Sequence, residues 1–382
     1  MNIVIFQNSS VDPEKGGISR MSKAYFDFLT AQGHSVYFLS LRDRGTGRLP
    51  RQLLVEEGTR EEQRRSFERI IDQFQLELMI YQDGVTPSNN YILHWAKGKR
   101  LVIVDVLHNS FRGMYGVEGH VRLSKIRSSS LKKSVNWLVN NYFRVKYGKL
   151  YREQFSLSDK VVLLSDKYRD EIRYFTGWRD FSKFTAITNP LTLDRPTSIN
   201  PNKKNTVLHV ALLSKAKRQD LLLDIWHLVE EKRPGWTLKI VGDGPLRASL
   251  IEKANALNLR HVEFLGFRSP QPYYDEASIF CLTSGVEGFG LVLIEAMAYG
   301  CVPMAFNSWE IASDIIDNEV NGILIKPFDV KAYADKLMAL MDDESLMGKM
   351  AHSAIEKSHA FDMEIVSHLW RNLLDELKCE KL

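Results

Sequence analysis

Two glutamates, Glu287 and Glu295, stand eight positions apart on either side of a glycine-containing turn in TSGVEGFGLVLIEAMAYGCVPMAF (283–306). Gly288 and Gly290 allow the backbone to approach a ligand where a side chain would collide. An apolar helix is expected directly after the turn, and its free N–H groups and positive dipole end suit a phosphate. Glu295 lies about one turn into that helix, so the two glutamates can contact opposite ends of one ligand. A diphosphate with a sugar at each end fits this spacing; an ordinary strand–turn–helix with a buried, ion-paired Glu295 is the alternative.

The same segment resembles the E-x(7)-E signature of retaining glycosyltransferases of family 4, which use nucleotide sugars and have the GT-B fold. The likeness extends to three further motifs, KIVGDGPLRASL (239–250), VEFLGF (262–267) and NGILIKPFD (321–329). It covers the chain from about residue 205 to 341, whereas the N-terminal half resembles the family only in a few short stretches. The resemblance implies an α/β protein with two Rossmann-like, doubly wound parallel-sheet domains that face a central cleft.

The resemblance also implies roles for individual residues. His108, at the end of an apolar strand, matches the family's histidine beside the reacting sugar, and Glu287 is expected to bind the sugar hydroxyls; these two are the predicted catalytic residues. A structural histidine is the alternative for His108. Glu295 is expected to contact the ribose, and Phe267 with Arg268 to cover the base. The predicted donor-binding residues are Gly16, Gly17, Lys217, Gly242, Phe267, Arg268, Gly288, Phe289, Gly290, Leu291 and Glu295.

One charge that the resemblance implies is missing. The family has a Gly-Arg-Leu run followed by a lysine five residues after the arginine, and both cations bind the diphosphate. Here Leu212 stands at the position of the arginine, while Lys217 matches the lysine. Lys215 and Arg218 are the candidates to replace the missing guanidinium, although a substitute in a rigid phosphate site need not reach the ligand.

The sequence contains no Asp-x-Asp motif and no His, Cys and carboxylate cluster with metal-ligand spacing. We therefore expect backbone amides and Lys217 to stabilise the leaving diphosphate, with no metal and no other cofactor. Gly16 and Gly17 precede a predicted helix and offer a second anion site. The full G-x-G-x-x-G of a dinucleotide-binding enzyme is absent there.

The composition is that of a globular protein large enough for two domains. The chain has 382 residues, of which 44% are hydrophobic and 26% charged. No apolar run reaches the roughly 18 residues that a membrane span requires, and the N-terminus reads as a strand, not a signal peptide. The three cysteines lack CxxC spacing, which indicates free thiols in a reducing cytoplasm.

A basic, aromatic block is the main feature of the charge distribution. Between Val121 and Arg152 there are nine basic residues and no acidic residue, with interleaved Trp and Tyr. Such a block favours an anionic membrane surface, and nucleic acid is not expected because no reading motif accompanies the charge. A solvated basic helix pair is the alternative. The residues predicted to face the membrane are Lys132, Lys133, Trp137, Arg144 and Lys146.

Apolar runs and turn residues predict the order of the elements. In the first domain, strands are expected at 2–6, 35–40, 77–81, 101–106, 160–165 and 184–187, with helices at 18–32 and 66–74. In the second, strands are expected at 206–211, 237–241, 262–265, 278–283, 302–306 and 322–325. The predicted limits are 1–190 for the first domain, 191–204 for a linker, 205–353 for the nucleotide-sugar domain and 354–382 for a helix that crosses back.

Together these features predict a metal-independent hexosyltransferase of cell-surface polysaccharide assembly, and the resemblance implies that it retains the anomeric configuration. Its donor is expected to be a nucleotide diphosphate sugar, with a UDP-sugar favoured, and its acceptor a saccharide or lipid-linked saccharide. We expect it in the cytoplasm, peripherally on the inner face of the cell membrane. Two alternatives stay open: a weak or inactive homologue that binds sugar nucleotide or membrane, and a nucleotide-sugar epimerase of the same fold.

Overall fold

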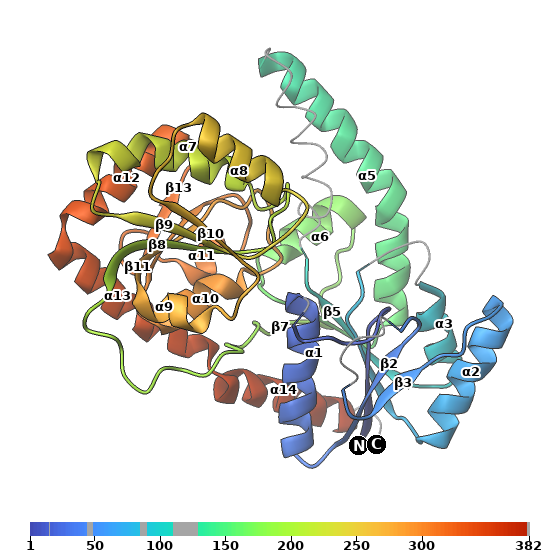
Figure 1. Ribbon diagram of the computed structural model, residues 1–382. Coiled ribbons are helices and arrows are strands. Elements are labelled where there is room, and N and C mark those ends of the chain that lie inside the picture. The colour runs from blue at the N-terminus through green and yellow to red at the C-terminus, as the bar shows by residue number, and fades with distance from the viewer. Residues whose placement is uncertain (15, 44–48, 85–89, 110–128, 380–382) are drawn as a thin grey trace. The chain divides into compact units, whose positions relative to one another are not determined.

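The computed structural model describes the chain except residues 15, 44–48, 85–89, 110–128 and 380–382 (Figure 1). The described residues form two compact units. The first consists of the chain up to Thr192 together with its end from Leu369, and the second runs from Leu193 to His368.

The first unit is built on a seven-stranded parallel sheet with the order β3-β2-β1-β4-β5-β6-β7. Six of its strands lie within two residues of the predicted ones, and their apolar runs are typical of strands covered on both faces. The additional strand, β3, is a three-residue edge strand. The strands are β1 (Asn2–Phe6), β2 (Ser35–Ser40), β3 (Gln52–Leu54), β4 (Leu78–Tyr81), β5 (Val102–Leu107), β6 (Lys160–Leu163) and β7 (Phe184–Ala186).

Helices cover both faces of this sheet (Figure 1). Helices α2 (Arg60–Gln73) and α3 (Asn90–Gly98) share one apolar core with β1, β2, β4 and β5. Helix α1 (Gly17–Ala31) packs against the end of α14 (Met363–Cys379): the Trp370 ring is fully buried and lies 4.8 Å from that of Tyr25. The chain end therefore contributes to the core of the first unit.

Helix α5 (Ser129–Leu157) is a single helix of 29 residues, not the helix pair considered from the basic block. It is followed by α6 (Tyr168–Thr176). Gly148 does not end α5: a Cβ there would lie 2.7 Å from the Phe175 carbonyl oxygen, so the missing side chain lets α5 approach α6 closely. No helix in the described part of the chain is long and apolar enough to cross a membrane.

The second unit contains a six-stranded parallel sheet with the order β10-β9-β8-β11-β12-β13. All six predicted strands are present with small shifts at their ends. They are β8 (Lys204–Val210), β9 (Thr237–Val241), β10 (Val262–Gly266), β11 (Ala277–Leu282), β12 (Val302–Phe306) and β13 (Ile323–Ile325). Its helices are α7 (Gln219–Val229), α8 (Arg247–Ala256), α9 (Gln271–Glu276), α10 (Leu291–Ala298), α11 (Ala312–Ile315), α12 (Val330–Asp342) and α13 (Glu344–Ser358).

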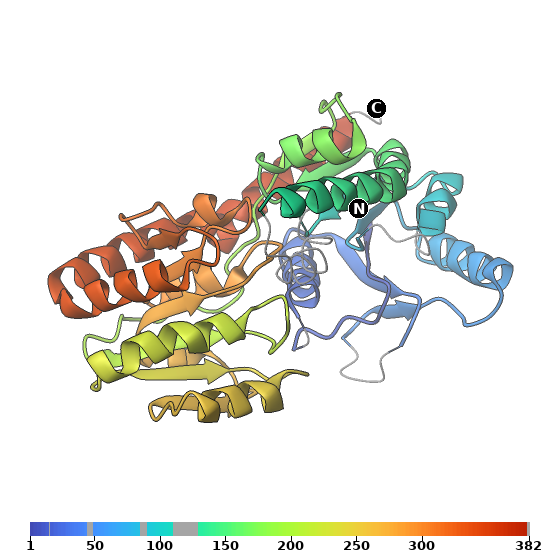
Figure 2. The ribbon, with the colours of Figure 1, turned by 90° about the horizontal axis from the view of Figure 1, so that it is seen from above.

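These helices lie on both faces of the second sheet. Helices α7, α8 and α12 cover one face over a core that includes Trp226 and Tyr333, and α9, α10 and α13 lie on the other face (Figures 1 and 2).

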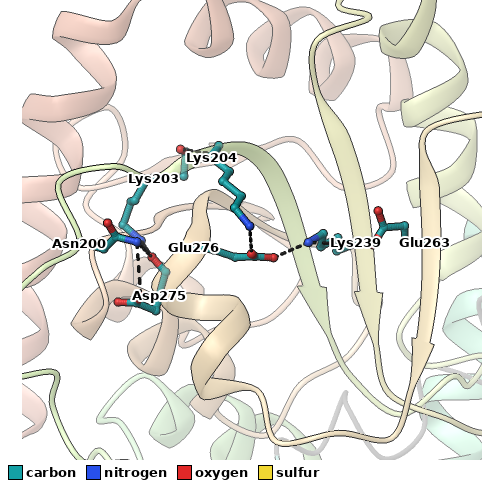
Figure 3. Close-up of polar contacts among 8 residues, drawn as sticks. Asn200, Lys203, Lys204, Lys239, Glu263, Asp275 and Glu276 are labelled. Atoms are coloured by element: carbon teal, nitrogen blue, oxygen red, sulfur yellow. Dashed lines mark hydrogen bonds and ion pairs between the residues drawn. The ribbon is translucent and has the colours of Figure 1, made fainter.

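A polar network holds α9 against the start of β8 (Figure 3). Lys203 Nζ donates to the Tyr274 carbonyl oxygen at 2.9 Å, and Lys204 Nζ donates to Glu276 at 2.6 Å. Lys239 of β9 donates to the other carboxylate oxygen of Glu276. This network fixes the helix that carries the Tyr274 side chain.

Both sheets have a point at which the strand order reverses. β1 lies beside β4 in the first unit, and β8 lies beside β11 in the second. The loops that follow these strands leave in opposite directions, which opens a crevice at the carboxyl ends of the strands. In sheets of this kind, that crevice is where ligands bind.

Candidate functional site

The loops after β8 and β11 meet at the switch point of the second unit. Thr283 Oγ1 donates to the carbonyl oxygens of Lys217 and Arg218, at 3.2 and 3.1 Å. The Gly285 amide donates to the carbonyl oxygen of Ala216 at 2.8 Å. These bonds tie the lysine-bearing loop to the loop that carries the first glutamate.

Lys217 and Glu287, which are 70 residues apart in the chain, are in direct contact. Lys217 Nζ donates to Glu287 Oε1 at 2.6 Å, and Ser284 Oγ donates to the same oxygen at 2.6 Å. The Glu287 side chain is 8% exposed and that of Lys217 is 23% exposed. The structure thus brings two predicted site residues together as an ion pair at the edge of the sheet. The Lys217 ammonium group is therefore already paired with a carboxylate in this structure.

Helix α10 begins beside this pair. Gly290 has φ 97°, a left-handed conformation that favours glycine, and no side chain caps the helix. The first-turn amides therefore lack a capping group from Gly290, as a helix N-terminal anion site requires. Phe289 is buried against Phe361, with ring centroids 5.8 Å apart, and Leu291 is also buried. These two buried side chains hold the turn in place, and its backbone lies at the carboxyl ends of the strands.

Glu295 is fully buried on α10. The Tyr274 hydroxyl donates to Glu295 Oε2 at 3.0 Å. Tyr274 lies on α9, the helix that the polar contacts of Lys203 and Lys204 hold in place. The ribose contact of Glu295 stays a prediction.

The turn after β9 approaches the β8 loop closely. A Cβ on Gly242, whose φ is 134°, would lie 2.0 Å from the Ala211 carbonyl oxygen, so only glycine fits there. Phe267 after β10 is 68% exposed, and Arg268 Nε donates to the Leu265 carbonyl oxygen at 2.9 Å. An exposed aromatic ring at this edge is available for a planar ligand group.

Leu212 is exposed at the position of the missing arginine, with 60% of its surface accessible. Arg218 is already engaged, since its Nε donates to Asp220 at 3.0 Å and its guanidinium lies over the Phe328 ring. Lys215 is exposed and has no ion-pair partner among the described residues. Of the two candidates for the missing charge, Lys215 is therefore the one whose ammonium group is available.

The remaining predicted residues lie in the first unit. His108 directly follows β5, is 8% exposed, and its Nε2 lies 2.9 Å from Gln82 Oε1. Burial lowers the pKa of His108 to about 4, so its ring is neutral at pH 7. Gly16 is the N-cap of α1 with φ 104°, and Gly17 is the first helical residue. The sequence did not single out Gln82, although a polar residue at the carboxyl end of an apolar strand was a usable signal.

The structure describes only part of the predicted membrane face. The Trp137 side chain is 64% exposed, and Arg144 and Lys146 are exposed on the same helix, α5. Lys132 and Lys133 belong to α5, but their side chains are outside the described part of the structure.

A cavity of about 400 Å³ lies at the carboxyl ends of β1 and β2 and at the start of α2. Two of its arginines, Arg42 and Arg60, have no carboxylate partner among the described residues, and the Arg60 guanidinium lies 3.8 Å from the centre of the Tyr91 ring. The cavity is lined by Asn8, Leu41, Arg42, Glu57, Gly58, Arg60, Gln63 and Tyr91. Within the described part of the chain, no group of three or more His, Cys, Asp and Glu side chains could hold a metal ion.

The two Rossmann-like units define the GT-B fold. Residues 192–359 match the family model described as glycosyl transferases group 1. The chain is 30% identical over 221 residues to an uncharacterized glycosyltransferase of Haemophilus influenzae, covering 56% of this chain and 61% of the relative.

Two further similarities extend this comparison. A Campylobacter jejuni N-acetylgalactosaminyltransferase, named for an undecaprenol-diphosphate-linked saccharide, is 27% identical over 60% of this chain and 58% of its own length. The solved structure of Anabaena HepE in complex with UDP has a TM-score of 0.72 at 18% identity, and covers 98% of this chain and 100% of that chain. The chain thus spans about six tenths of the length of both sequence relatives.

Proposed function

We propose that this protein is a glycosyltransferase that moves a hexose from a nucleotide diphosphate sugar to a hydroxyl of a saccharide acceptor. The observation that carries the proposal is the Lys217–Glu287 ion pair beside the N-terminus of α10, at the switch point between β8 and β11. This arrangement offers a cation and backbone amides for a diphosphate, and a carboxylate for the hydroxyls of an adjoining sugar.

The reaction breaks the bond between the anomeric carbon and the diphosphate, and negative charge grows on the leaving oxygen. The Lys217 ammonium group and the α10 amides stabilise that charge, the task for which other enzymes of this class use a metal ion. The Glu287 carboxylate accepts hydrogen bonds from sugar hydroxyls and favours positive charge at the anomeric carbon. Retention of the anomeric configuration is proposed from the resemblance of the E-x(7)-E segment alone.

The donor is proposed to be a UDP-sugar and the acceptor a saccharide on a lipid carrier. The UDP-bound HepE structure supports the nucleotide, and the name of the Campylobacter relative supports the carrier. A peripheral position on the cytoplasmic face of the membrane is part of the proposal. It is supported by the exposure of Trp137, Arg144 and Lys146 on α5, because such side chains suit an anionic membrane surface. Cell-surface polysaccharide assembly is the corresponding pathway class.

The cavity beside Arg42 and Arg60 is the proposed place for part of the acceptor. Its volume of about 400 Å³ suits one or two sugar rings. The two guanidinium groups favour a phosphate or carboxylate on that acceptor.

An inactive homologue that only binds sugar nucleotide is the second candidate, because Leu212 removes one expected charge from the diphosphate site. One experiment separates the two: purified protein is incubated with a panel of UDP-, GDP- and ADP-sugars, with and without EDTA. Thermal stabilisation reports binding, and a coupled assay reports release of the nucleotide diphosphate. Stabilisation with release in EDTA supports the proposal, and stabilisation without release under any condition supports the inactive homologue. No stabilisation by any donor would overturn both.

A further inference from the structure

A chain of hydrogen-bonded side chains lies buried at the switch point of the first sheet. Gln7 directly follows β1, Gln82 directly follows β4 and His108 directly follows β5, and their exposures are 8%, 1% and 8%. Ser22 of α1, which is fully buried, connects the two glutamines. Gln82 Nε2 donates to Ser22 Oγ at 2.8 Å, and Ser22 Oγ lies 3.1 Å from Gln7 Oε1.

The donors and acceptors of this chain fix the orientation of the Gln82 amide. The Ser22 hydroxyl has one hydrogen, and the Gln7 Oε1 and Ile18 carbonyl oxygens both lie within 3.1 Å to accept it. Ser22 is therefore the acceptor toward Gln82, whose NH₂ group must face the serine. The Gln82 carbonyl oxygen then faces His108 Nε2, 2.9 Å away. A carbonyl oxygen only accepts, so Nε2 carries the hydrogen of the imidazole ring.

The charge state of His108 determines what its other nitrogen offers. Because burial keeps this ring neutral at pH 7, it carries a single ring N–H. With that hydrogen on Nε2, Nδ1 has a lone pair. No described residue other than Gln82 forms a hydrogen bond with the ring.

We propose that Gln82 is a positioning residue that fixes His108 as the Nε2–H tautomer, so that Nδ1 is the hydrogen-bond acceptor offered to a ligand. Only the identity of that ligand rests on the proposed function: a hydroxyl of the donor sugar donates to Nδ1. A phosphate or carboxylate oxygen is repelled by the same lone pair. His108 is thereby matched to the sugar and not to the diphosphate, and Gln82 sets this preference without touching the substrate.

The tautomer is measured directly by NMR on the full-length protein, labelled with ¹⁵N in the histidine rings and free of nucleotide sugar. The His108 signals are assigned by their loss in His108→Gln. We expect a protonated Nε2 and an unprotonated Nδ1 at pH 7. A protonated Nδ1, or a doubly protonated ring at this pH, would overturn the proposal. The measurement needs no transferase activity, so its result is independent of whether the proposed function is right.

Two variants test whether Gln82 determines the tautomer of His108. Gln82→Met keeps the size of the side chain but removes the acceptor, and should shift the His108 tautomer ratio toward Nδ1–H by about tenfold, the effect of losing one hydrogen bond. Gln82→Glu should change the His108 spectrum as well, because a carboxyl group then faces Nε2. Gln73→Met is the matched control, since Gln73 is exposed at the end of α2.

The outcome of the variants is decided by comparison with wild type. If both Gln82 variants fold and keep the wild-type His108 spectrum, the glutamine does not set the tautomer. If Gln82→Met does not fold, Gln82→Leu, which also removes the acceptor, decides the question together with the wild-type tautomer. With a donor that the protein accepts, Gln82→Met should lower kcat by about tenfold and leave the KM for the acceptor unchanged. A merely structural role predicts lower stability but no change in tautomer.

Discussion

Restoring the missing arginine by Leu212→Arg should strengthen donor binding without destabilising the protein. Leu212 is 60% exposed, so a longer side chain extends into solvent and no buried space has to be found. We therefore expect the free energy of unfolding to stay within about 0.5 kcal/mol of wild type, as for other surface substitutions. An arginine at this position would therefore not be buried without a partner.

The gain in affinity follows from the chemistry of the new contact. A hydrogen bond to a charged group contributes roughly 1.5–3 kcal/mol when it is shielded from water. At a largely exposed position about half of that remains, which corresponds to a dissociation constant for UDP about fivefold lower. The gain should shrink as salt is added, because the new charge is open to screening.

The assay is isothermal titration of UDP into Leu212→Arg, wild type and a control variant, Leu228→Arg. Leu228 is an exposed leucine at the far end of α7, so the control adds the same charge to the same unit away from the switch point. Equal affinities of Leu212→Arg and wild type, or an equal gain in the control, would refute the assignment of this edge to the diphosphate.

Three further predictions concern stability and the acceptor. Burial raises the pKa of Asp105 from 3.8 to about 7, so the stability that its neutral carboxyl group contributes at low pH is lost as pH rises through 7. Asp105→Asn, which cannot ionise, should be more stable than wild type by up to about 4 kcal/mol at pH 8 and similarly stable at pH 4. Parallel pH profiles of the two proteins in urea unfolding would contradict this. Tyr274→Phe removes a hydrogen bond to the buried Glu295 and should cost about 1.5–3 kcal/mol of unfolding free energy, whereas an unchanged urea midpoint would show that the hydroxyl contributes nothing. With UDP present, Arg60→Gln should weaken the binding of glucose 1-phosphate, a model phosphosugar, about fivefold in calorimetric titration. Unchanged binding would show that the cavity does not bind the phosphate of an acceptor.

Much of the fold could be predicted because apolar runs alternate with helical periodicity along the chain. Twelve of the strands follow such runs closely. Strand β3, which was not predicted, has three residues at the edge of the sheet, too few for a periodic pattern. Gly148 shows why a glycine alone does not define the end of a helix: glycine is a common end signal, but here it allows contact with the Phe175 backbone inside a continuous helix.

The sequence suggested candidate site residues but not the contacts that those residues make. The E-x(7)-E segment identified Glu287, yet a glutamate in a loop reads from sequence as a solvated side chain with little effect on stability. The structure places it under Lys217 and Ser284, at 8% exposure, because loops from two separate strands meet at the switch point. The hydrogen-bond partners of Gln82 and Tyr274 lie 26 and 21 residues away in the chain, so the sequence carries no local signal of these two contacts. For Gln82, only its place at the carboxyl end of an apolar strand marked the residue itself.

If Glu287 binds the donor sugar, Glu287→Gln should slow the release of nucleotide diphosphate. The substitution keeps the shape of the side chain and removes its charge. The matched control is Glu319→Gln, an exposed glutamate whose ion pair with Lys336 has the same length of 2.6 Å. With the donor that wild type accepts, we expect a rate at least about 100-fold lower for Glu287→Gln and a normal rate for the control. A folded Glu287→Gln protein that releases the nucleotide within about threefold of the wild-type rate, a difference of less than about 1 kcal/mol in barrier height, would show that Glu287 does not bind the donor sugar.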